Sequence, residues 1–88
     1  MKWHTPLAYS KYMDSMREPK RPQWQLIEQI GYCQAWIVRD TANNRLCLQS
    51  YSTIVSYVEP STKEIVHLGK WSVTTSHHQT RFRRELVR

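Results

Sequence analysis

Four histidines, two cysteines and a series of hydroxyl residues are the side chains of this 88-residue chain that could bind a metal or catalyse a reaction. His77 and His78 are adjacent, so a regular helix would point them about 100° apart and away from a shared metal ion. The other two histidines are distant in sequence, and the chain has no CxxC or HxxxH spacing and no acidic cluster. The sequence therefore predicts no metal site.

A nucleophilic enzyme needs a general base beside a serine or cysteine, and a third group that orients the base. No spacing suggests such a set around Cys33, Cys47 or a serine, and the seven acidic residues are scattered. The two glycines, Gly31 and Gly69, are too few for a phosphate-binding glycine loop. These patterns favour a binding protein without enzyme activity and without a cofactor.

Basic residues are the remaining candidates for chemistry, because the formal net charge is +6 and is concentrated at both ends of the chain. Residues 1–22 carry five Lys or Arg and two acidic residues, and residues 70–88 carry five Lys or Arg and one acidic residue. The middle of the chain, residues 23–69, carries three Lys or Arg and four acidic residues. Cationic ends on a neutral core suit a nucleic acid or an acidic protein surface as partner, while the alternative is a solvated surface that only maintains solubility.

Eight residues form the predicted partner-binding set. Arginine can grip a phosphate or carboxylate through two parallel hydrogen bonds, although cations near a helix C-terminus are also favoured by the helix dipole alone. Trp71 could stack on an unpaired base or pack in the core. The set comprises Lys20, Arg21, Lys70, Trp71, Arg81, Arg83, Arg84 and Arg88.

The second half of the chain organises the predicted fold. Ser50–Glu59 alternates β-branched and aromatic residues with apolar groups on both sides, which predicts a central strand covered on both faces. Pro60 marks a turn, and Glu64–Leu68 is a second short strand, so the pair predicts an antiparallel hairpin. The residues assigned to one face of the first strand are Tyr51, Thr53, Val55 and Tyr57.

A helix is predicted over Ser76–Val87. His78, Phe82 and Leu86 are spaced four apart and would form one buried stripe. Hydroxyl side chains just before the helix can accept hydrogen bonds from its free backbone N–H groups. The candidates for this cap are Ser72, Thr74 and Thr75.

Residues 1–22 are predicted to be a basic N-terminal arm. Pro6–Arg17 has the spacing of a short amphipathic helix, with a disordered arm as the alternative. Glu18–Pro22 contains two prolines and is predicted to be a solvated linker. Gln23–Ile30 suits either one or two helical turns or the beginning of a strand.

Residues 23–88 are predicted to be a single small α+β domain. Tyr32–Arg39 is rich in strand formers, and Asp40–Asn44 is a turn. Arg45–Gln49 resumes as a strand that we expect to be continuous with Ser50–Glu59, either straight or bent near Gln49 and Ser50. The predicted fold is an antiparallel β-meander of about three to four strands with the C-terminal α-helix packed on one face.

Compartment and cysteine state follow from composition. No N-terminal apolar segment resembles a signal peptide, and no apolar run approaches the ~18 residues of a membrane span. We therefore expect a reducing cytoplasm, in which Cys33 and Cys47 are free and buried, with a cross-strand disulfide as the alternative.

The second half of the chain also carries a longer pattern, SYxTIVxY, a short loop, and then GKWSxTTSxHxxxF. The pattern resembles a group of small, mostly uncharacterised proteins of bacteriophages and related mobile elements, in which tyrosine more often stands at the position of Trp71. The resemblance implies a fold and a biological context, and it implies no catalytic residue. The residues that carry it are Ser50, Tyr51, Thr53, Ile54, Val55, Trp71, Ser72, Thr74, Thr75, His78 and Phe82.

In this context we expect a small non-enzymatic phage-type protein that inhibits or modulates a host nucleic-acid-handling complex, most concretely an anti-CRISPR-like inhibitor. The alternative is a basic module that contacts the phosphate backbone of nucleic acid through its Arg-rich C-terminal helix. A third interpretation is an assembly protein that oligomerises through a sheet edge. The expected partner is a host protein, a ribonucleoprotein or nucleic acid in the bacterial cytoplasm, and the expected state is a monomer or homodimer.

Overall fold

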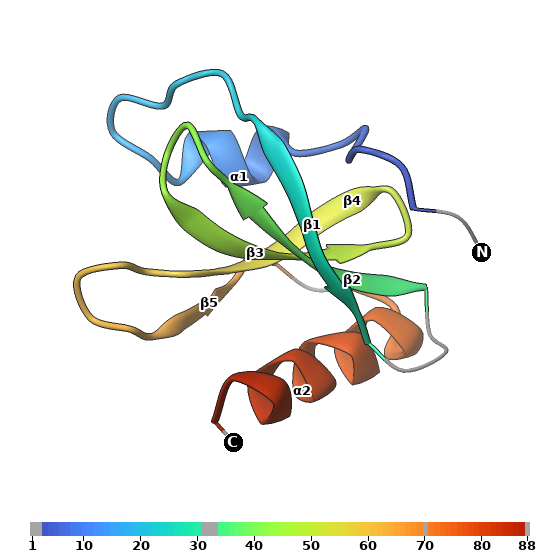
Figure 1. Cartoon of the computed structure of the whole chain (residues 1–88). Helices are drawn as coiled ribbons and strands as arrows, with labels where there is room; N and C mark the ends of the chain where they lie inside the picture. The colour runs from blue at the N-terminus through green and yellow to red at the C-terminus, as the bar shows by residue number, and fades with distance from the viewer. Residues whose placement is uncertain (1–2, 31–33, 70, 88) are drawn as a thin grey trace.

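The computed structural model describes residues 3–30, 34–69 and 71–87, and it has an α+β fold (Figure 1). The strands form one antiparallel sheet in the order β1-β2-β3-β4-β5, which is a meander. This confirms the predicted fold class, with five strands in the described part of the chain. The elements are α1 (Ser10–Asp14), β1 (Trp24–Gln29), β2 (Ala35–Asp40), β3 (Arg45–Ser50), β4 (Thr53–Val58), β5 (Ile65–His67) and α2 (Val73–Val87).

The β2–β3 hairpin closes where the sequence predicts a turn. Asn44 has a left-handed backbone conformation with φ 54°, which asparagine tolerates better than most residues. The buried Asp40 carboxylate organises the turn, because its Oδ1 accepts hydrogen bonds from the backbone N–H groups of Ala42 and Asn43. Its Oδ2 accepts a hydrogen bond of 2.6 Å from the Tyr12 hydroxyl, which ties the N-terminal segment to the sheet.

β3 and β4 are separate strands, so the prediction of one continuous strand through residues 45–59 is wrong. The chain reverses at Tyr51 and Ser52. Tyr51 has a φ of 56°, and its backbone N–H donates to the Gln34 carbonyl, while the Ser52 carbonyl accepts from Ala8. The turn is therefore held by tertiary hydrogen bonds, and no Gly, Asn or Pro marks it in the sequence.

A bulge in β4 breaks the predicted alternation of faces. Ser56 pairs with Leu48 and Ile54 pairs with the next residue of β3, which leaves Val55 as the extra residue. Val55 packs in the cluster beneath α2, whereas Ile54 and Tyr57 pack in the cluster on the other face. The prediction that Val55 and Tyr57 share a face is therefore wrong, and the prediction of a central strand covered on both faces is confirmed.

The β4–β5 hairpin and β1 complete the sheet. β5 pairs antiparallel with β4, as predicted. Residues 24–29 form β1, so the segment left open between helical turns and a strand is a strand at the edge of the sheet. The predicted turn at Gly31 and the beginning of the predicted strand at Tyr32 and Cys33 lie outside the described residues.

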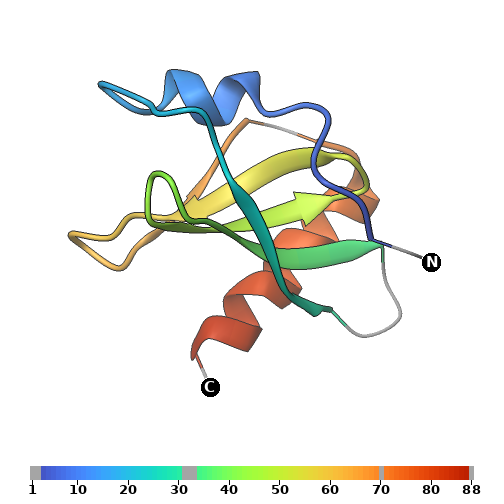
Figure 2. The ribbon, with the colours of Figure 1, turned by 45° about the horizontal axis from the view of Figure 1, so that its top comes forward.

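The N-terminal segment lies across the face of the sheet opposite to α2 (Figures 1 and 2). α1 spans five residues, so the helix predicted over Pro6–Arg17 is too long. Pro6 is buried, and Ala8 forms a parallel bridge with Thr53 beside β4. Because β5 is three residues long, this extended segment pairs with a part of β4 that β5 does not reach.

α2 begins at Val73, earlier than the predicted Ser76. Ser72 is the cap, because its hydroxyl accepts a hydrogen bond of 3.3 Å from the backbone N–H of Thr75. The predicted buried stripe is confirmed, since His78 and Phe82 are buried and Leu86 packs against the same cluster.

Two apolar clusters hold the N-terminal segment, the sheet and α2 together as three layers (Figure 2). The complete burial of Tyr12 makes the N-terminal segment part of the core. Within the described residues, neither helix combines the length and apolar character needed to cross a membrane. The cluster on the α1 side contains Tyr12, Trp36, Val38, Cys47, Ile54, Tyr57 and Leu68, and the cluster beneath α2 contains Ile30, Ala35, Ile37, Leu48, Val55 and Phe82.

Candidate anion-binding surface

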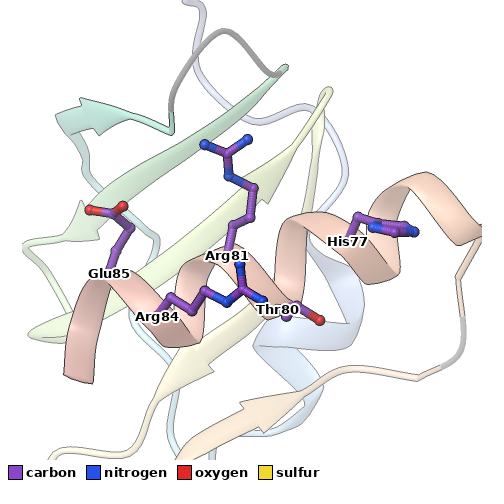
Figure 3. Close-up of a pocket in the computed structure, with 5 residues that line it drawn as sticks. All are labelled: His77, Thr80, Arg81, Arg84 and Glu85. Carbon is purple, nitrogen blue, oxygen red and sulfur yellow. The ribbon is translucent and has the colours of Figure 1, made fainter. Parts of the chain in front are cut away.

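The outward side of α2 carries exposed arginines. Burial of His78 and Phe82 fixes the rotation of the helix, and this rotation places Arg81 and Arg84 in solvent. Figure 3 shows Arg81 and Glu85 on the same side of α2, with Arg84 extending along the helix toward Thr80. The hollow on this flank has a volume of about 360 Å³ and is lined by His77, Thr80, Arg81, Arg84 and Glu85.

Arg83 points to the opposite flank of α2, because two helical positions separate it from Arg81 by about 200°. It lines a second hollow of about 450 Å³ together with the β4–β5 hairpin. A third hollow of about 230 Å³ also contains Lys63, and Arg39 lines it from β2. We call these two adjoining hollows the basic groove; its charged residues in the described chain are Arg39, Lys63, Arg83 and Glu64.

Sequence reasoning missed three residues of the basic groove, namely Arg39, Lys63 and His67. Arg39 shares the α2 side of the sheet because it alternates with the buried Ile37. Lys63 comes from a turn and His67 from a short strand, and the hairpin brings both beside Arg83. No spacing in the sequence relates these elements, because their proximity depends on strand pairing and helix packing.

Lys63 has an unusual backbone conformation for a lysine. Its φ is 63°, and its N–H donates a hydrogen bond of 2.8 Å to the Glu59 carbonyl. A residue with a Cβ atom is disfavoured in this left-handed region by about 1–2 kcal/mol, and glycine or asparagine is the usual occupant. The side chain at this position therefore costs stability while it lines the groove.

A hydrogen-bonded chain connects the basic groove to the interior. The Oγ atom of Ser56 lies 2.7 Å from His67 Nδ1, and the side-chain amide of Gln79 donates to the same Oγ at 3.1 Å. Burial, and secondarily the charge of Arg83, lowers the pKa of His67. The Ser56–His67 contact is unsuited to nucleophilic catalysis, because Ser56 is completely buried and a substrate cannot reach its Oγ.

A second serine–histidine contact is structural. His78 Nδ1 lies 2.9 Å from Ser50 Oγ, which is also 3.1 Å from Thr75 Oγ1. Burial, and then the charges of Arg81 and His77, lowers the pKa of His78. The contact joins α2 to the end of β3, so His78 is a packed helix residue whose ring bonds a neighbour.

The eight predicted binding residues do not converge on one surface. Lys20 and Arg21 belong to the segment on the α1 side, where the Lys20 backbone exchanges hydrogen bonds with the Asn43 side chain. Lys70 and Arg88 lie outside the described residues. Of the remaining four, Arg81 and Arg84 share one flank of α2 and Arg83 lies on the other.

Trp71, the aromatic member of that set, is half-buried. It packs against the cluster beneath α2, and the Lys11 ammonium lies 4.8 Å from a ring centroid of its indole. Of the two interpretations of Trp71, the structure therefore shows core packing. The Lys11 ammonium already contacts the ring.

The described residues offer no group of side chains for a metal ion, and their cysteine is buried. No group of three or more His, Cys, Asp or Glu side chains there could hold a metal ion. Cys47 is free and buried, as predicted, and Cys33 lies outside the described residues. Burial raises the pKa of the Cys47 thiol to about 12, so it packs as a neutral group near pH 7.

The α1 side of the molecule differs in chemistry from the α2 side. A hollow of about 540 Å³ lies beside α1 and is lined by Leu7, Ala8, Tyr9, Ser10, Met13 and Asp14. Leu7 is 75% exposed at its rim. The molecule therefore has a basic side at α2 and a largely apolar hollow at the N-terminal segment.

These features define a small α+β protein with a basic groove between its C-terminal helix and a β-hairpin. A family model matches residues 19–86, and the chain belongs to that family, a family of unknown function (DUF8033). The matched region contains the whole sheet and nearly all of α2, and it excludes α1. No curated protein matches the chain, and no solved structure does.

Proposed function

We propose that the protein is a non-enzymatic binding protein that contacts the phosphate backbone of nucleic acid through α2 and the β4–β5 hairpin. The observation that carries this proposal is the pair of polar hollows on the two flanks of α2. One is lined by Arg81 and Arg84, and the other by Arg83 and Lys63. Arginine and lysine contacts to phosphate supply most of the sequence-independent affinity of nucleic-acid-binding proteins.

The arrangement of the cations suits a backbone that passes over the helix. Arginines on opposite flanks of α2 can contact phosphates that are separated along a strand, while the helix itself lies between them. Within the described residues that line the three hollows, Glu64 and Glu85 are the acidic side chains, against five Lys or Arg. Binding of this type has weak sequence selectivity, because it reads phosphates rather than base edges.

The test is fluorescence anisotropy with labelled single-stranded and double-stranded oligonucleotides. If about four phosphates are neutralised, affinity for duplex DNA falls by about 100-fold between ~50 mM and ~200 mM salt. Replacing Arg81, Arg83 and Arg84 together by alanine should weaken binding to every sequence and reduce the salt dependence.

The matched control removes the same charge from the α1 side, by alanine at Arg17, Lys20 and Arg21. This control should retain most of the affinity. The proposal fails if the control loses as much affinity as the α2 variant, or if binding does not respond to salt.

A second candidate function is inhibition of a host nucleic-acid-handling complex, with an anti-CRISPR-like inhibitor encoded by a phage or mobile element as its most concrete form. The apolar hollow beside α1, with Leu7 exposed at its rim, favours this candidate. Protein partners bury apolar side chains, whereas a phosphate backbone does not. A molecule that carries arginines on α2 and an apolar hollow beside α1 suits a partner that contains both nucleic acid and protein.

The inhibitor candidate is tested by pull-down from bacterial extract, with and without nuclease, at two salt concentrations. A protein that is retained after nuclease treatment and lost with Leu7→Asp supports it. Recovery of nucleic acid alone, released at high salt, contradicts it and leaves the first proposal in place.

A further inference from the structure

We propose that the hollow around His67 is a phosphate-binding site, in which His67 Nε2–H, the Lys63 ammonium and the Arg83 guanidinium bind a single phosphate group. The inference rests on the proposed function, because it assigns one site for a phosphate of the nucleic acid. That phosphate is either a terminal group or a backbone diester, and the two sources share the same oxygen acceptors.

The hydrogen bonds around Ser56 determine which nitrogen of His67 carries the proton. The Val55 carbonyl can only accept, so the Gln79 atom that lies 3.2 Å from it is the amide nitrogen. The other hydrogen of that nitrogen is donated to Ser56 Oγ. Ser56 is completely buried, so its own hydroxyl hydrogen needs an acceptor, and His67 Nδ1 lies 2.7 Å away. His67 is therefore neutral, with its proton on Nε2.

This tautomer directs a hydrogen-bond donor from His67 toward the groove. His67 is exposed and lines the hollow with Lys63 and Arg83. Partial desolvation of the ring, and secondarily the charge of Arg83, lowers the pKa of His67 and so disfavours the protonated form. The Ser56–Gln79 chain holds the ring in position, so the donor is oriented before a ligand arrives.

The chemistry of the three donors favours phosphate over other anions. They come from a turn, a strand and a helix, and all three line the same hollow. A tetrahedral phosphate presents oxygens in several directions, whereas a carboxylate presents two in a plane. The two cations balance its charge, and the neutral imidazole adds a donor without adding charge repulsion.

Substitutions at Lys63 and Glu64 distinguish an effect on phosphate binding from an effect on folding. Lys63→Gly removes the ammonium and relieves the left-handed backbone, so the turn should be retained or stabilised. Glu64 lines the same hollow and opposes an anion, so Glu64→Gln should strengthen binding. Stability and affinity therefore change in opposite directions in Lys63→Gly.

The experiment is a two-dimensional NMR titration of the histidine side chains with inorganic phosphate. We expect the free protein to show His67 as the neutral Nε2–H tautomer. Phosphate should shift the His67 signals saturably and raise the pKa of His67, with much smaller changes at His4. Lys63→Gly should weaken this binding by about tenfold, Glu64→Gln should tighten it, and Lys20→Ala should leave it unchanged.

Parallel titrations with oligonucleotides that carry either a 5′-phosphate or a 5′-hydroxyl distinguish the two sources. A response that requires the 5′-phosphate identifies a terminal group, and an equal response identifies the backbone. The site is refuted if His67 carries its proton on Nδ1, or if Lys63→Gly leaves the phosphate titration unchanged. Phosphate binding at His67 without oligonucleotide binding would refute the proposed function alone, and oligonucleotide binding with no response at His67 would refute the site alone.

Discussion

Replacement of Tyr12 tests whether the N-terminal segment is an integral part of the core, although it lies outside the region matched by the family model. Tyr12 is completely buried. Its ring centroid lies 5.7 Å from that of Trp24 and 5.8 Å from that of Tyr57, and its hydroxyl donates to Asp40. Burial raises the pKa of Tyr12 above its usual range, so the hydroxyl remains a donor.

The expected magnitudes follow from these contacts. Tyr12→Phe removes a hydrogen bond to a carboxylate, and such bonds contribute ~1.5–3 kcal/mol. The same Asp40 oxygen keeps the Asn43 side-chain donor at 2.7 Å, so we expect the lower end of that range. Tyr12→Ala also removes the ring, and deletion of a buried aromatic ring costs ~3–5 kcal/mol. For 88 residues, a total stability of ~4–13 kcal/mol is typical, so the alanine variant should lose a large share of it.

The assay is urea unfolding followed by tryptophan fluorescence and circular dichroism. Leu7→Ala is the control, because Leu7 lies in the same segment but is exposed, and its effect should stay within about 0.5 kcal/mol. If Tyr12→Ala lowers the free energy of unfolding by less than about 1 kcal/mol, the reasoning is refuted, because removal of a buried aromatic ring destabilises a protein by more than that. The segment would then not pack on the sheet in solution.

Buried or strained positions elsewhere in the chain give three further predictions. Because the pKa of His78 is lowered from 6.5, the unfolded state binds protons more readily below that pH, and the free energy of unfolding should fall as the solution is acidified. His78→Gln should reduce this acid slope in urea titrations at about pH 5 and pH 7.5, and His67, whose pKa is also lowered, contributes to the slope that remains. Cys47, in a Cys33→Ser background, should react with a thiol reagent only after denaturant is added, and rapid labelling of the folded protein would contradict its burial. Gly69→Ala should cost ~1–3 kcal/mol in thermal or urea unfolding, because the φ of Gly69 is 99°, and an unchanged midpoint would show that the backbone relaxes.

Local sequence patterns were sufficient where neighbouring residues decide the structure. The four-residue spacing of His78, Phe82 and Leu86 predicted the buried face of α2, because helical periodicity is a local property. Asn44 marked the β2–β3 turn, since asparagine tolerates the left-handed conformation that the turn requires. The α+β class and the β4–β5 hairpin followed in the same way.

Patterns failed where distant contacts outweigh local preference. Tyr51 forms a turn without Gly, Asn, Asp or Pro, because backbone groups of Gln34 and the N-terminal segment hydrogen-bond to it and to Ser52. Val55 bulges out of register and joins the cluster beneath α2. Alternation alone cannot reveal either feature, since an apolar residue at those positions is compatible with a regular strand.

In the candidate site, too, some features follow from local sequence and others from contacts between distant residues. The sequence by itself determined that the chain is basic at both ends, that α2 carries several arginines, and that these lie off its buried stripe. Only the tertiary structure decided which cations meet, because a helix turns by about 100° per residue and so separates Arg83 from Arg81. Strand pairing then brought Lys63 and His67 beside Arg83, whereas the backbone of Lys20 bonds the Asn43 side chain at the β2–β3 turn.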